Sequence, residues 1–339
     1  MRVLIIKLSS LGDIVHTLPV LYFLKQAYPN AEIDWVTEEV GSSLLAGHPY
    51  IKRLLIYKRY GWPKALKEGR WLELLNELRQ FKRLLQQDYY DLVLDFQGLF
   101  KSGLIASLAK GKEKIGFANG REGSYFFLNK KYKANYDEHA VIRYLRLLAF
   151  AGIPVDFDRI SFPLISAPLP FSLESPYVVI NPVARWPSKM WFKERWVALA
   201  KALIKLGYRV IFTGAKGDRD YIASICQKVP SALNLAGKTD LKQLVSLYRQ
   251  AYLTISVDTG TMHLAAAAGS PVITLFGPTA PWRTGPFGQG HTVIFKKLSC
   301  QPCFQKTCPS RRCLAAIAVE EVIEALKKHL SSLSTGPGQ

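Results

Sequence analysis

The sequence lacks the features of several protein classes. No segment of its 339 residues reaches the roughly 18 uninterrupted apolar residues that a membrane-spanning helix needs. The first residues, MRVLIIKL, have neither the basic start nor the small-residue cleavage site of a signal peptide, so we expect a cytoplasmic protein. Hydrophobic residues make up 49% of the chain, which excludes fibrous and disordered classes, and the length predicts about two domains.

Acidic residues are also scarce, since 26 Asp and Glu stand against 45 Lys and Arg and give a formal charge of +19. This excess predicts an acidic partner: nucleic acid, anionic lipid or a phosphorylated substrate. Ten of the cations lie in residues 52–83, interleaved with Trp62 and Trp71. Apolar rings beside cations favour a lipid headgroup layer over a base-reading helix, and a solvated charged face is the alternative.

Two function classes lose support because their motifs are missing. Neither half of the chain carries G-x-G-x-x-G after its first strand with an acid about 20 residues further on, which argues against an NAD-dependent oxidoreductase. A basic nucleic-acid-binding protein is a remote alternative, because the chain has no recognisable reading motif for a nucleic acid.

Short apolar runs alternate with amphipathic stretches, a pattern typical of βαβ units and parallel sheets. Strands are predicted near residues 2–8, 31–38, 52–57, 90–96, 113–118, 176–182, 208–214, 232–236, 252–257 and 271–276. Residues 155–176 contain four prolines and no helical period, and therefore indicate a linker. The sequence thus predicts an α/β protein of two doubly wound domains, residues 1–165 and 166–339.

Two helices can be predicted individually. In residues 189–207 apolar side chains recur every three or four positions, and Gly207 is placed to end the helix. In residues 319–333 the apolar stripe contains Val319, Val322, Leu326 and Leu330, which indicates a final surface helix.

The stretch SSLGDIVHTLP, residues 9–19, lies where the first strand should lead into the first helix. Nucleotide-binding domains keep carboxylates away from this corner, because phosphates bind at the helix N-terminus. Asp13 stands there instead. It is either a functional carboxylate or only a helix cap.

The second half offers candidate phosphate-binding corners. In Asp258-Thr259-Gly260-Thr261 a tight turn opens a helix, so backbone N–H groups and threonine hydroxyls can bind a diphosphate, although a plain helix cap is the bland alternative. The GPT at 277–279 repeats the corner at a neighbouring strand end.

Three further side chains belong to the same half. Lys189 follows the first strand of this half and can neutralise a phosphate, unless it is simply solvated. Asp218 can accept from sugar hydroxyls or cap a helix. His263, one turn into its helix, is by default a buried packing residue.

Taken together, VLIIKLSSLGDIVHTLPVL, DFQGLFKSG and SVDTGTMHLAAAAGSPVITLFGPT resemble the bacterial lipopolysaccharide heptosyltransferases of glycosyltransferase family 9, most closely the type that adds the first heptose. The resemblance covers almost the whole chain. It implies a GT-B fold, in which two Rossmann-like domains face each other across a cleft, with the acceptor on the N-terminal domain and the nucleotide sugar on the C-terminal one.

The same resemblance implies roles for individual residues. Asp13 would be the general base of an inverting transfer. Donor-binding residues would be Lys189, Asp218, Asp258, Thr259, Gly260, Thr261 and His263, with Asp218 departing from the glutamate of the best-known first-heptose enzymes. Acceptor-binding residues would be Ser10, Gly12, Gln97, Lys101 and Arg121, joined by Arg59 and Lys64 of the basic segment.

Cysteines are few but clustered, with Cys300, Cys303, Cys308 and Cys313 inside fourteen residues and Cys226 alone. In a cytosolic protein four thiolates can hold a structural zinc, and free or transiently oxidised thiols are the alternative. Catalysis is expected to need no cofactor.

The resulting functional expectation is transfer of L-glycero-D-manno-heptose from ADP-heptose to the Kdo-containing inner core of lipopolysaccharide, without a divalent metal. Addition of the second heptose, or use of another nucleotide sugar, is the nearer alternative. We expect a monomer attached peripherally to anionic lipid at the inner face of the inner membrane, with a Kdo-lipid A or heptosylated inner-core acceptor and no nucleic acid partner.

Overall fold

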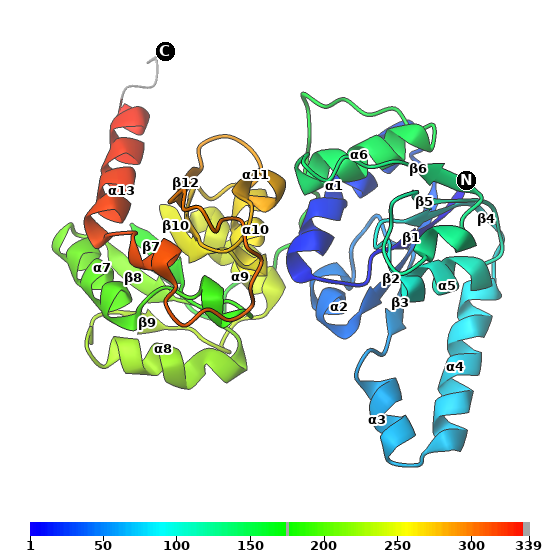
Figure 1. The fold of residues 1–339 in the computed structure, drawn as a ribbon, viewed down its shortest axis with the longest axis horizontal. Coiled ribbons are helices and arrows are strands. Elements are labelled where there is room, and N and C mark those ends of the chain that lie inside the picture. The colour runs from blue at the N-terminus through cyan, green and yellow to red at the C-terminus, as the bar shows by residue number, and fades with distance from the viewer. Residues whose placement is uncertain (174–175, 335–339) are drawn as a thin grey trace. The chain divides into compact units, whose positions relative to one another are not determined.

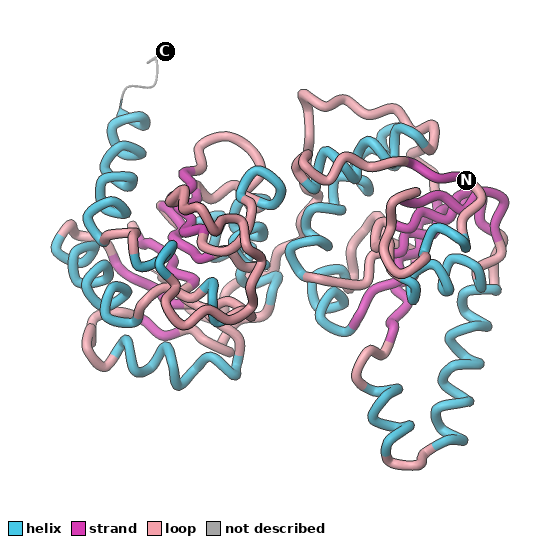
Figure 2. The backbone as a smooth tube through the Cα atoms, viewed as in Figure 1, coloured by secondary structure: helices cyan, strands magenta, loops and turns pink. Residues whose placement is uncertain are grey.

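The computed structural model describes residues 1–173 and 176–334, and the chain forms two compact units, Met1–Ile165 and Ser166–Gln339 (Figure 1). Each unit contains one sheet of six parallel strands surrounded by helices (Figure 2). Within the described residues, no helix is long and apolar enough to cross a membrane.

The first unit has the strand order β3-β2-β1-β4-β5-β6. Its strands are β1 (Arg2–Ile6), β2 (Glu32–Glu38), β3 (Arg53–Tyr57), β4 (Tyr90–Asp95), β5 (Gly111–Phe117) and β6 (Lys130–Tyr132). Its helices are α1 (Leu11–Ala27), α2 (Glu39–Leu45), α3 (Gly61–Lys67), α4 (Trp71–Gln86), α5 (Phe100–Leu108) and α6 (Ala140–Phe150), with a 3-10 turn η1 (Ser124–Phe127).

The second unit repeats this order as β12-β11-β10-β7-β8-β9. Its strands are β7 (Tyr177–Asn181), β8 (Arg209–Phe212), β9 (Leu233–Asn234), β10 (Leu253–Val257), β11 (Val272–Phe276) and β12 (Thr292–Phe295). Its helices are α7 (Lys193–Lys205), α8 (Arg219–Cys226), α9 (Leu241–Gln250), α10 (Gly260–Ala267), α11 (Pro281–Thr284), α12 (Arg312–Ala315) and α13 (Val319–Ser334), with 3-10 turns η2 (Pro187–Lys189) and η3 (Lys216–Asp218).

Both sheets therefore have the strand order of the Rossmann fold, and the prediction of two doubly wound α/β domains is confirmed. The central strands are apolar on both faces because helices cover both sides of such a sheet. In β1, Val3 to Ile6 are all fully buried, and in β10 the whole strand is buried.

The two individually predicted helices are confirmed. In α7, Trp196, Leu199 and Leu203 are buried, and the chain leaves the helix through Gly207, whose φ of 88° suits a glycine. In α13, Val322 and Leu326 are buried, whereas the side chain of Leu330 lies outside the described residues.

Two strands were not predicted. Both β6 and β12 lie at sheet edges, where one side of the strand has no neighbour, and neither has the buried apolar run of a central strand. The helices α3 and α4 form a hairpin that projects from the sheet of the first unit (Figure 1). At its base Trp62 packs edge-on against Tyr57 and Phe81, with ring centroids 4.8 and 5.3 Å away.

Candidate active site

In both sheets the strand order reverses between the first and fourth strands of the unit. Ligands of open α/β sheets bind at the carboxyl ends of the strands at this switch point. In the first unit the switch point lies between β1 and β4, so it is flanked by the loops that lead to Asp13 and Gln97. In the second unit it lies between β7 and β10, which precede Lys189 and Asp258.

Asp13 lies in the first turn of α1 and is half-buried. Its Oδ2 accepts a hydrogen bond from the backbone N–H of Ser10 at 3.0 Å and another from the Ser10 hydroxyl at 2.9 Å. Its Oδ1 accepts from the hydroxyl of Tyr144 at 3.2 Å. Asp13 thus takes part in a capping contact at the start of α1, as the helix-cap interpretation predicted, and also has a long-range partner in Tyr144.

Behind Tyr144 lies a buried lysine. Lys7, at the carboxyl end of β1, donates from Nζ to the Tyr144 hydroxyl at 2.8 Å and to the carbonyl of Phe96 at 3.0 Å. Since the Tyr144 hydroxyl accepts from Lys7, its own proton is available for Asp13. The three side chains form a chain of donors that runs from an ammonium group to the carboxylate.

The protonation states of Lys7 and Tyr144 agree with hydrogen bonds donated from Lys7 to Tyr144 and from Tyr144 to Asp13. Burial lowers the pKa of Lys7, but the neighbouring Tyr144 and Asp13 outweigh it, so the Lys7 pKa is raised above its ordinary value. Burial and the charge of Asp13 raise the pKa of Tyr144, which keeps its proton. Sequence analysis missed both residues: nothing in a lone Lys or Tyr signals a partner 137 positions away.

Gln97 organises the loop in front of Asp13. Its side-chain carbonyl accepts from the backbone N–H groups of Leu8 and Ser9, both at 3.1 Å. The buried Asp95 holds the loop that carries Gln97, because its carboxylate accepts hydrogen bonds from the backbone N–H groups of Gln97 and Gly98. The Gln97 side chain, predicted to bind the acceptor, therefore holds the loop before α1 in the structure. Gly12, at the start of α1, is buried.

Two of the predicted acceptor-side cations meet at one carboxylate. Arg59 and Lys101 both form ion pairs with the buried Glu38, at 3.1 and 2.5 Å. Lys64 is more exposed and lies 3.7 Å from Glu68. Arg121 is exposed, and no ion pair of its side chain is found within the described residues. The sequence did not indicate that Glu38 would pair with two of these cations, which leaves the group of three with one net positive charge.

Three further basic side chains lie in α1 and at the start of α6, and one of them contacts Tyr144. Arg143 is buried, its guanidinium lies over the rings of Tyr136 and Tyr144, and it donates to the carbonyl of Glu138 at 3.3 Å. The rings of His16 and His139 meet edge-on with centroids 5.2 Å apart. Sequence analysis singled out none of the three: Arg143 and His16 lie within α6 and α1, and His139 is the N-cap of α6.

In the second unit the structure brings three predicted elements together. Lys189, the last residue of η2, forms an ion pair of 2.6 Å with Asp258. The same Asp258 oxygen accepts from the hydroxyl of Thr279 at 2.5 Å. The DTGT corner after β10 and the GPT corner after β11 are therefore neighbours, as parallel strand ends require, and the lysine is paired rather than solvated.

The helix behind this corner is α10, with Thr259 as its N-cap. In the described structure the Thr259 hydroxyl makes no cap hydrogen bond, and Gly260 and Thr261 follow as the first helical residues. Below them, the buried Tyr248 donates to the side-chain oxygen of Asn181 at 3.0 Å, and burial raises the pKa of Tyr248 to about 12. Buried, uncharged and hydrogen-bonded side chains therefore lie beneath the start of α10.

The two remaining donor candidates have structural partners. Asp218 ends η3 and its Oδ2 accepts from the N–H of Ala215 at 2.8 Å, so it closes its own turn and is half-exposed above it. His263 is buried within α10, as the default packing interpretation predicted.

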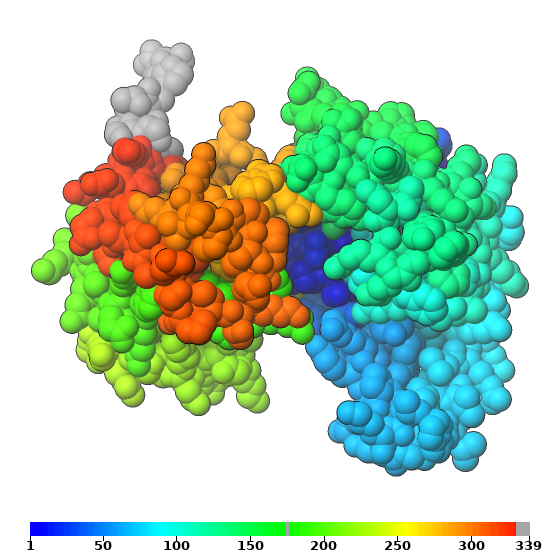
Figure 3. Space-filling view, viewed as in Figure 1, coloured from blue at the N-terminus to red at the C-terminus, as the bar shows by residue number. Residues whose placement is uncertain are grey.

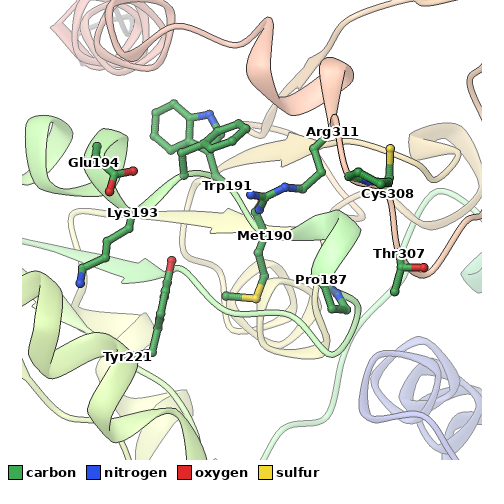
Figure 4. Close-up of a pocket in the computed structure, with 11 residues that line it drawn as sticks. Pro187, Met190, Trp191, Lys193, Glu194, Tyr221, Thr307, Cys308 and Arg311 are labelled. Carbon is green, nitrogen blue, oxygen red and sulfur yellow. The ribbon is translucent and has the colours of Figure 1, made fainter.

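A cavity of about 620 Å³ opens next to η2 (Figure 4). Its walls include Met190, Trp191 and Tyr221 together with Cys308 and Arg311 from a later segment of the chain. The guanidinium of Arg311 lies over the ring of a neighbouring phenylalanine and donates to the carbonyl of Met190 at 2.9 Å. Sequence analysis had not placed these two chain segments side by side.

The cysteines do not gather as a metal site requires. All of them are free thiols, with Cys300 exposed and Cys313 buried. Within residues 1–173 and 176–334, no group of three or more His, Cys, Asp or Glu side chains is arranged to hold a metal ion. The residues as placed do not fit the predicted zinc at Cys300, Cys303, Cys308 and Cys313, and zinc binding stays a prediction without structural support.

Known proteins match this chain over most of its length. Residues 78–313 match the model of glycosyltransferase family 9 (heptosyltransferase). Lipopolysaccharide heptosyltransferase 1 of Pseudomonas aeruginosa is 32% identical over 91% of this chain and 87% of its own. The Escherichia coli K12 protein of the same name is 31% identical over 86% of this chain and 93% of its own.

Solved structures agree. The structure described as E. coli heptosyltransferase WaaC with ADP has a TM-score of 0.82 and 28% identity, and covers 97% of this chain and all of that one. E. coli ADP-heptose LPS heptosyltransferase II has a TM-score of 0.78 at 24% identity, over 99% of this chain and 100% of that one. These neighbours confirm the GT-B fold class, and the chain belongs to glycosyltransferase family 9, the heptosyltransferases.

Proposed function

We propose that the protein is an inverting transferase of the heptosyltransferase I type, which moves heptose from ADP-heptose to the Kdo region of the lipopolysaccharide inner core. The observation that carries the proposal is the 32% identity, over 91% of the chain, to a lipopolysaccharide heptosyltransferase 1. Structures of the similar WaaC contain ADP or ADP-2-deoxy-2-fluoro heptose, which supports an ADP-linked donor.

Asp13 is the general base of this reaction. The acceptor hydroxyl gives its proton to the Asp13 carboxylate while its oxygen attacks the anomeric carbon of the heptose. The bond from that carbon to the diphosphate oxygen breaks on the opposite face, so the configuration inverts and ADP leaves. Support comes from the position of Asp13 at the switch point and from its two hydrogen-bonded neighbours, Ser10 and Tyr144.

The donor binds in the second unit, residues 166–339. Lys189 and the N-terminus of α10, at Thr259 to Thr261, stabilise the negative charge that develops on the departing diphosphate. Asp258 holds the Lys189 ammonium in place until then. His263 supports α10 from within, and Asp218 lies where a ribose hydroxyl can donate to it. These cationic and dipolar groups supply the charge that a divalent metal provides in other transferases, so catalysis needs no metal.

The acceptor binds to the first unit, residues 1–165. Arg121 has an exposed guanidinium suited to bidentate pairing with a carboxylate or phosphate. Arg59, Lys64 and Lys101 add positive charge on the same unit, while Ser10, Gly12 and Gln97 shape the loop around Asp13. The enzyme works as a monomer in the cytoplasm and is held peripherally on the inner face of the inner membrane.

An ADP-release assay with ADP-heptose and a deacylated Kdo-lipid acceptor tests the proposal. Asp13→Ala should lower kcat by at least a hundredfold, because general-base catalysis contributes about 10² to 10⁴. ADP affinity should stay unchanged and the protein should stay folded, although loss of the helix-start contact with Ser10 should lower the unfolding midpoint by about 2 °C. Addition of EDTA should leave the wild-type rate unaltered.

Asp156→Ala is the matched control, since this exposed carboxylate of the same unit lies 4.0 Å from Arg159 and away from the switch point. An Asp13→Ala protein that keeps most of its rate would remove Asp13 as the base. A wild-type protein that turns over only with a heptosylated acceptor would assign the second heptose instead. Elemental analysis of the purified protein tests the zinc prediction separately.

A further inference from the structure

The helix α4, in the projecting hairpin, carries three different faces. One is buried against the rest of the first unit and contains Leu74, Phe81 and Leu85 at positions i, i+7 and i+11. A second carries the acids Glu73 and Glu77. With 3.6 residues per turn, a third group of residues falls on a face that points away from both: Trp71, Leu72, Leu75, Arg79, Lys82 and Arg83.

The third face is apolar at the start of the helix. Trp71 is 58% exposed, Leu72 is 80% exposed, and Leu75 is also exposed. These are large values for apolar side chains that occur together on one helix turn. In the neighbouring helix α3, Leu66 is exposed as well. Figure 3 shows the hairpin, in lighter blue, as a projection of the first unit.

The same face becomes cationic further along the helix. Arg79, Lys82 and Arg83 follow Leu72 and Trp71 at helical spacing, and all three are exposed. Within the described residues, none of the three lies within ion-pair distance of a carboxylate. Three other cations near the hairpin are paired: Lys58 with Glu77, Lys64 with Glu68, and Arg70 with Glu68 and Glu73. Among the described residues, the unpaired cations of the hairpin are therefore the three of the third face and the exposed Lys67 of α3.

We propose that this α4 face, made of Trp71, Leu72, Leu75, Arg79, Lys82 and Arg83, binds the interface of an anionic lipid bilayer. The helix is about 24 Å long and lies in the membrane plane. Its leucines and tryptophan enter the boundary between headgroups and acyl chains, and its cations pair with lipid phosphates. The inference rests on the proposed function in one respect, since a lipid-linked acceptor gives the attachment its purpose.

Charge decides between the possible occupants of the face. A second copy of the chain packed symmetrically on it would bury Arg79, Lys82 and Arg83 against their own counterparts or against the partner's Leu72 and Leu75, with no carboxylate of this face to pair with them. A nucleic acid would satisfy the cations but leave Leu72 and Leu75 in water. An anionic bilayer satisfies both the apolar and the cationic part.

Flotation with vesicles tests the inference on the full-length protein without any acceptor. Vesicles of phosphatidylcholine with one third phosphatidylglycerol should carry the wild type, and pure phosphatidylcholine vesicles should carry far less. The triple variant Arg79→Gln/Lys82→Gln/Arg83→Gln should lower the partition coefficient roughly a hundredfold, since each interfacial cation contributes a factor of about five. Leu72→Ser with Leu75→Ser should lower it at least about tenfold.

Matched controls use the same chemistry elsewhere. Leu84→Ser changes an exposed leucine of α4 on the acidic side. Lys201→Gln/Lys205→Gln/Lys228→Gln removes the same charge from the exposed surface of the second unit. Both controls should float like the wild type. Unchanged flotation of the α4 variants would overturn the inference. So would a loss of vesicle binding in the Lys201/Lys205/Lys228 control equal to the loss in the Arg79/Lys82/Arg83 variant.

Activity separates this inference from the proposed function. The α4 variants should keep the wild-type rate on a soluble, deacylated acceptor and lose rate only on acceptor embedded in vesicles. A protein that floats as expected but transfers heptose to neither acceptor would contradict the proposed function and leave the membrane face standing. A dimer in light scattering that the α4 substitutions dissociate would replace the bilayer with a second copy.

Discussion

Each oxygen of the Asp13 carboxylate has its own partner, and the two partners come from different parts of the chain. Ser10 is three residues away, whereas Tyr144 lies in α6, and Lys7 stands behind it. A general base must be both oriented and kept charged. The chain from Lys7 through Tyr144 can do both, because hydrogen bonds donated to a carboxylate stabilise its charged form.

Substitution of Tyr144 tests this link. Tyr144→Phe keeps the ring against Phe96 and Phe117 but removes the hydroxyl. We expect kcat to fall about tenfold, and the acid limb of the profile of kcat/KM against pH to move to higher pH, because the charged form of Asp13 loses a hydrogen-bond donor. A pH-rate series on both proteins measures the two effects.

The control removes an equivalent bond elsewhere. The Tyr90 hydroxyl donates to the buried Asp34 at 2.7 Å, so Tyr90→Phe also deprives a carboxylate of a buried phenol. It should cost about 1 to 3 kcal/mol of stability and leave the pH profile in place. A Tyr144→Phe protein that behaves in the same way would show that Tyr144 is only structural.

The positions of three candidate site residues could be predicted because each follows the end of a strand, while their roles stay predictions. Asp13, Lys189 and Asp258 each follow a central parallel strand, so their placement at a switch point follows from topology. The pairing of Lys189 with Asp258, and of Arg59 and Lys101 with Glu38, depends on packing of distant segments. No spacing rule encodes such pairs.

At the scale of single elements, the edge strand β12 is joined to β11 partly through His291. The Nδ1 of His291 accepts from the backbone N–H of Val272 at 3.2 Å, which requires an unprotonated nitrogen. Burial lowers the pKa of His291 below its ordinary value. The folded state therefore holds His291 neutral, while the unfolded chain takes up a proton near its ordinary pKa of 6.5.

Stability contributed by this contact is present above pH 6.5 and is lost as the pH falls through the unfolded pKa toward the lower folded one. Thermal unfolding at pH 7.5 and 5.5 should show a drop in the midpoint, and His291→Asn should reduce that drop by about 2 °C because the amide oxygen accepts the bond without titrating. An equal drop in both proteins would exclude His291 as the source.

Elements with a buried apolar run were predictable, and those without one were not. The central strands and α7 could be predicted from the spacing of their apolar residues and from the length of the apolar runs. In contrast β6 reads KKY and is mostly exposed, and only its pairing with β5 makes it a strand. β9 is limited to Leu233 and Asn234, shorter than the predicted run of five, because it also lies at an edge.

At the scale of the whole molecule, the two units repeat one strand order but present different chemistry at their switch points. The first unit places a carboxylate after its first strand, and the second places a lysine there. A doubly wound fold was predictable from the alternating pattern of apolar and amphipathic stretches. The difference between the two switch points could be predicted only from the individual residues that follow each strand.

Hydrogen exchange with ADP alone tests the division. Amides in residues 186–190, 213–218 and 257–263 should exchange about tenfold more slowly or better at saturating ADP, because binding suppresses local opening. Residues 8–13 of the first unit should exchange at the same rate with and without ADP. Lys189→Gln should weaken the protection, and protection that appears mainly in residues 8–13 would assign the nucleotide to the first unit.

The ion pairs of Glu38 carry an evolutionary consequence. One buried carboxylate forms ion pairs with both Arg59 and Lys101, so its loss would leave a guanidinium and an ammonium group close together without a counterion. Loss of either cation alone still leaves a balanced pair. Descendant sequences should therefore shed one of the two cations before, or together with, the glutamate, and the reverse order of mutations should be rare.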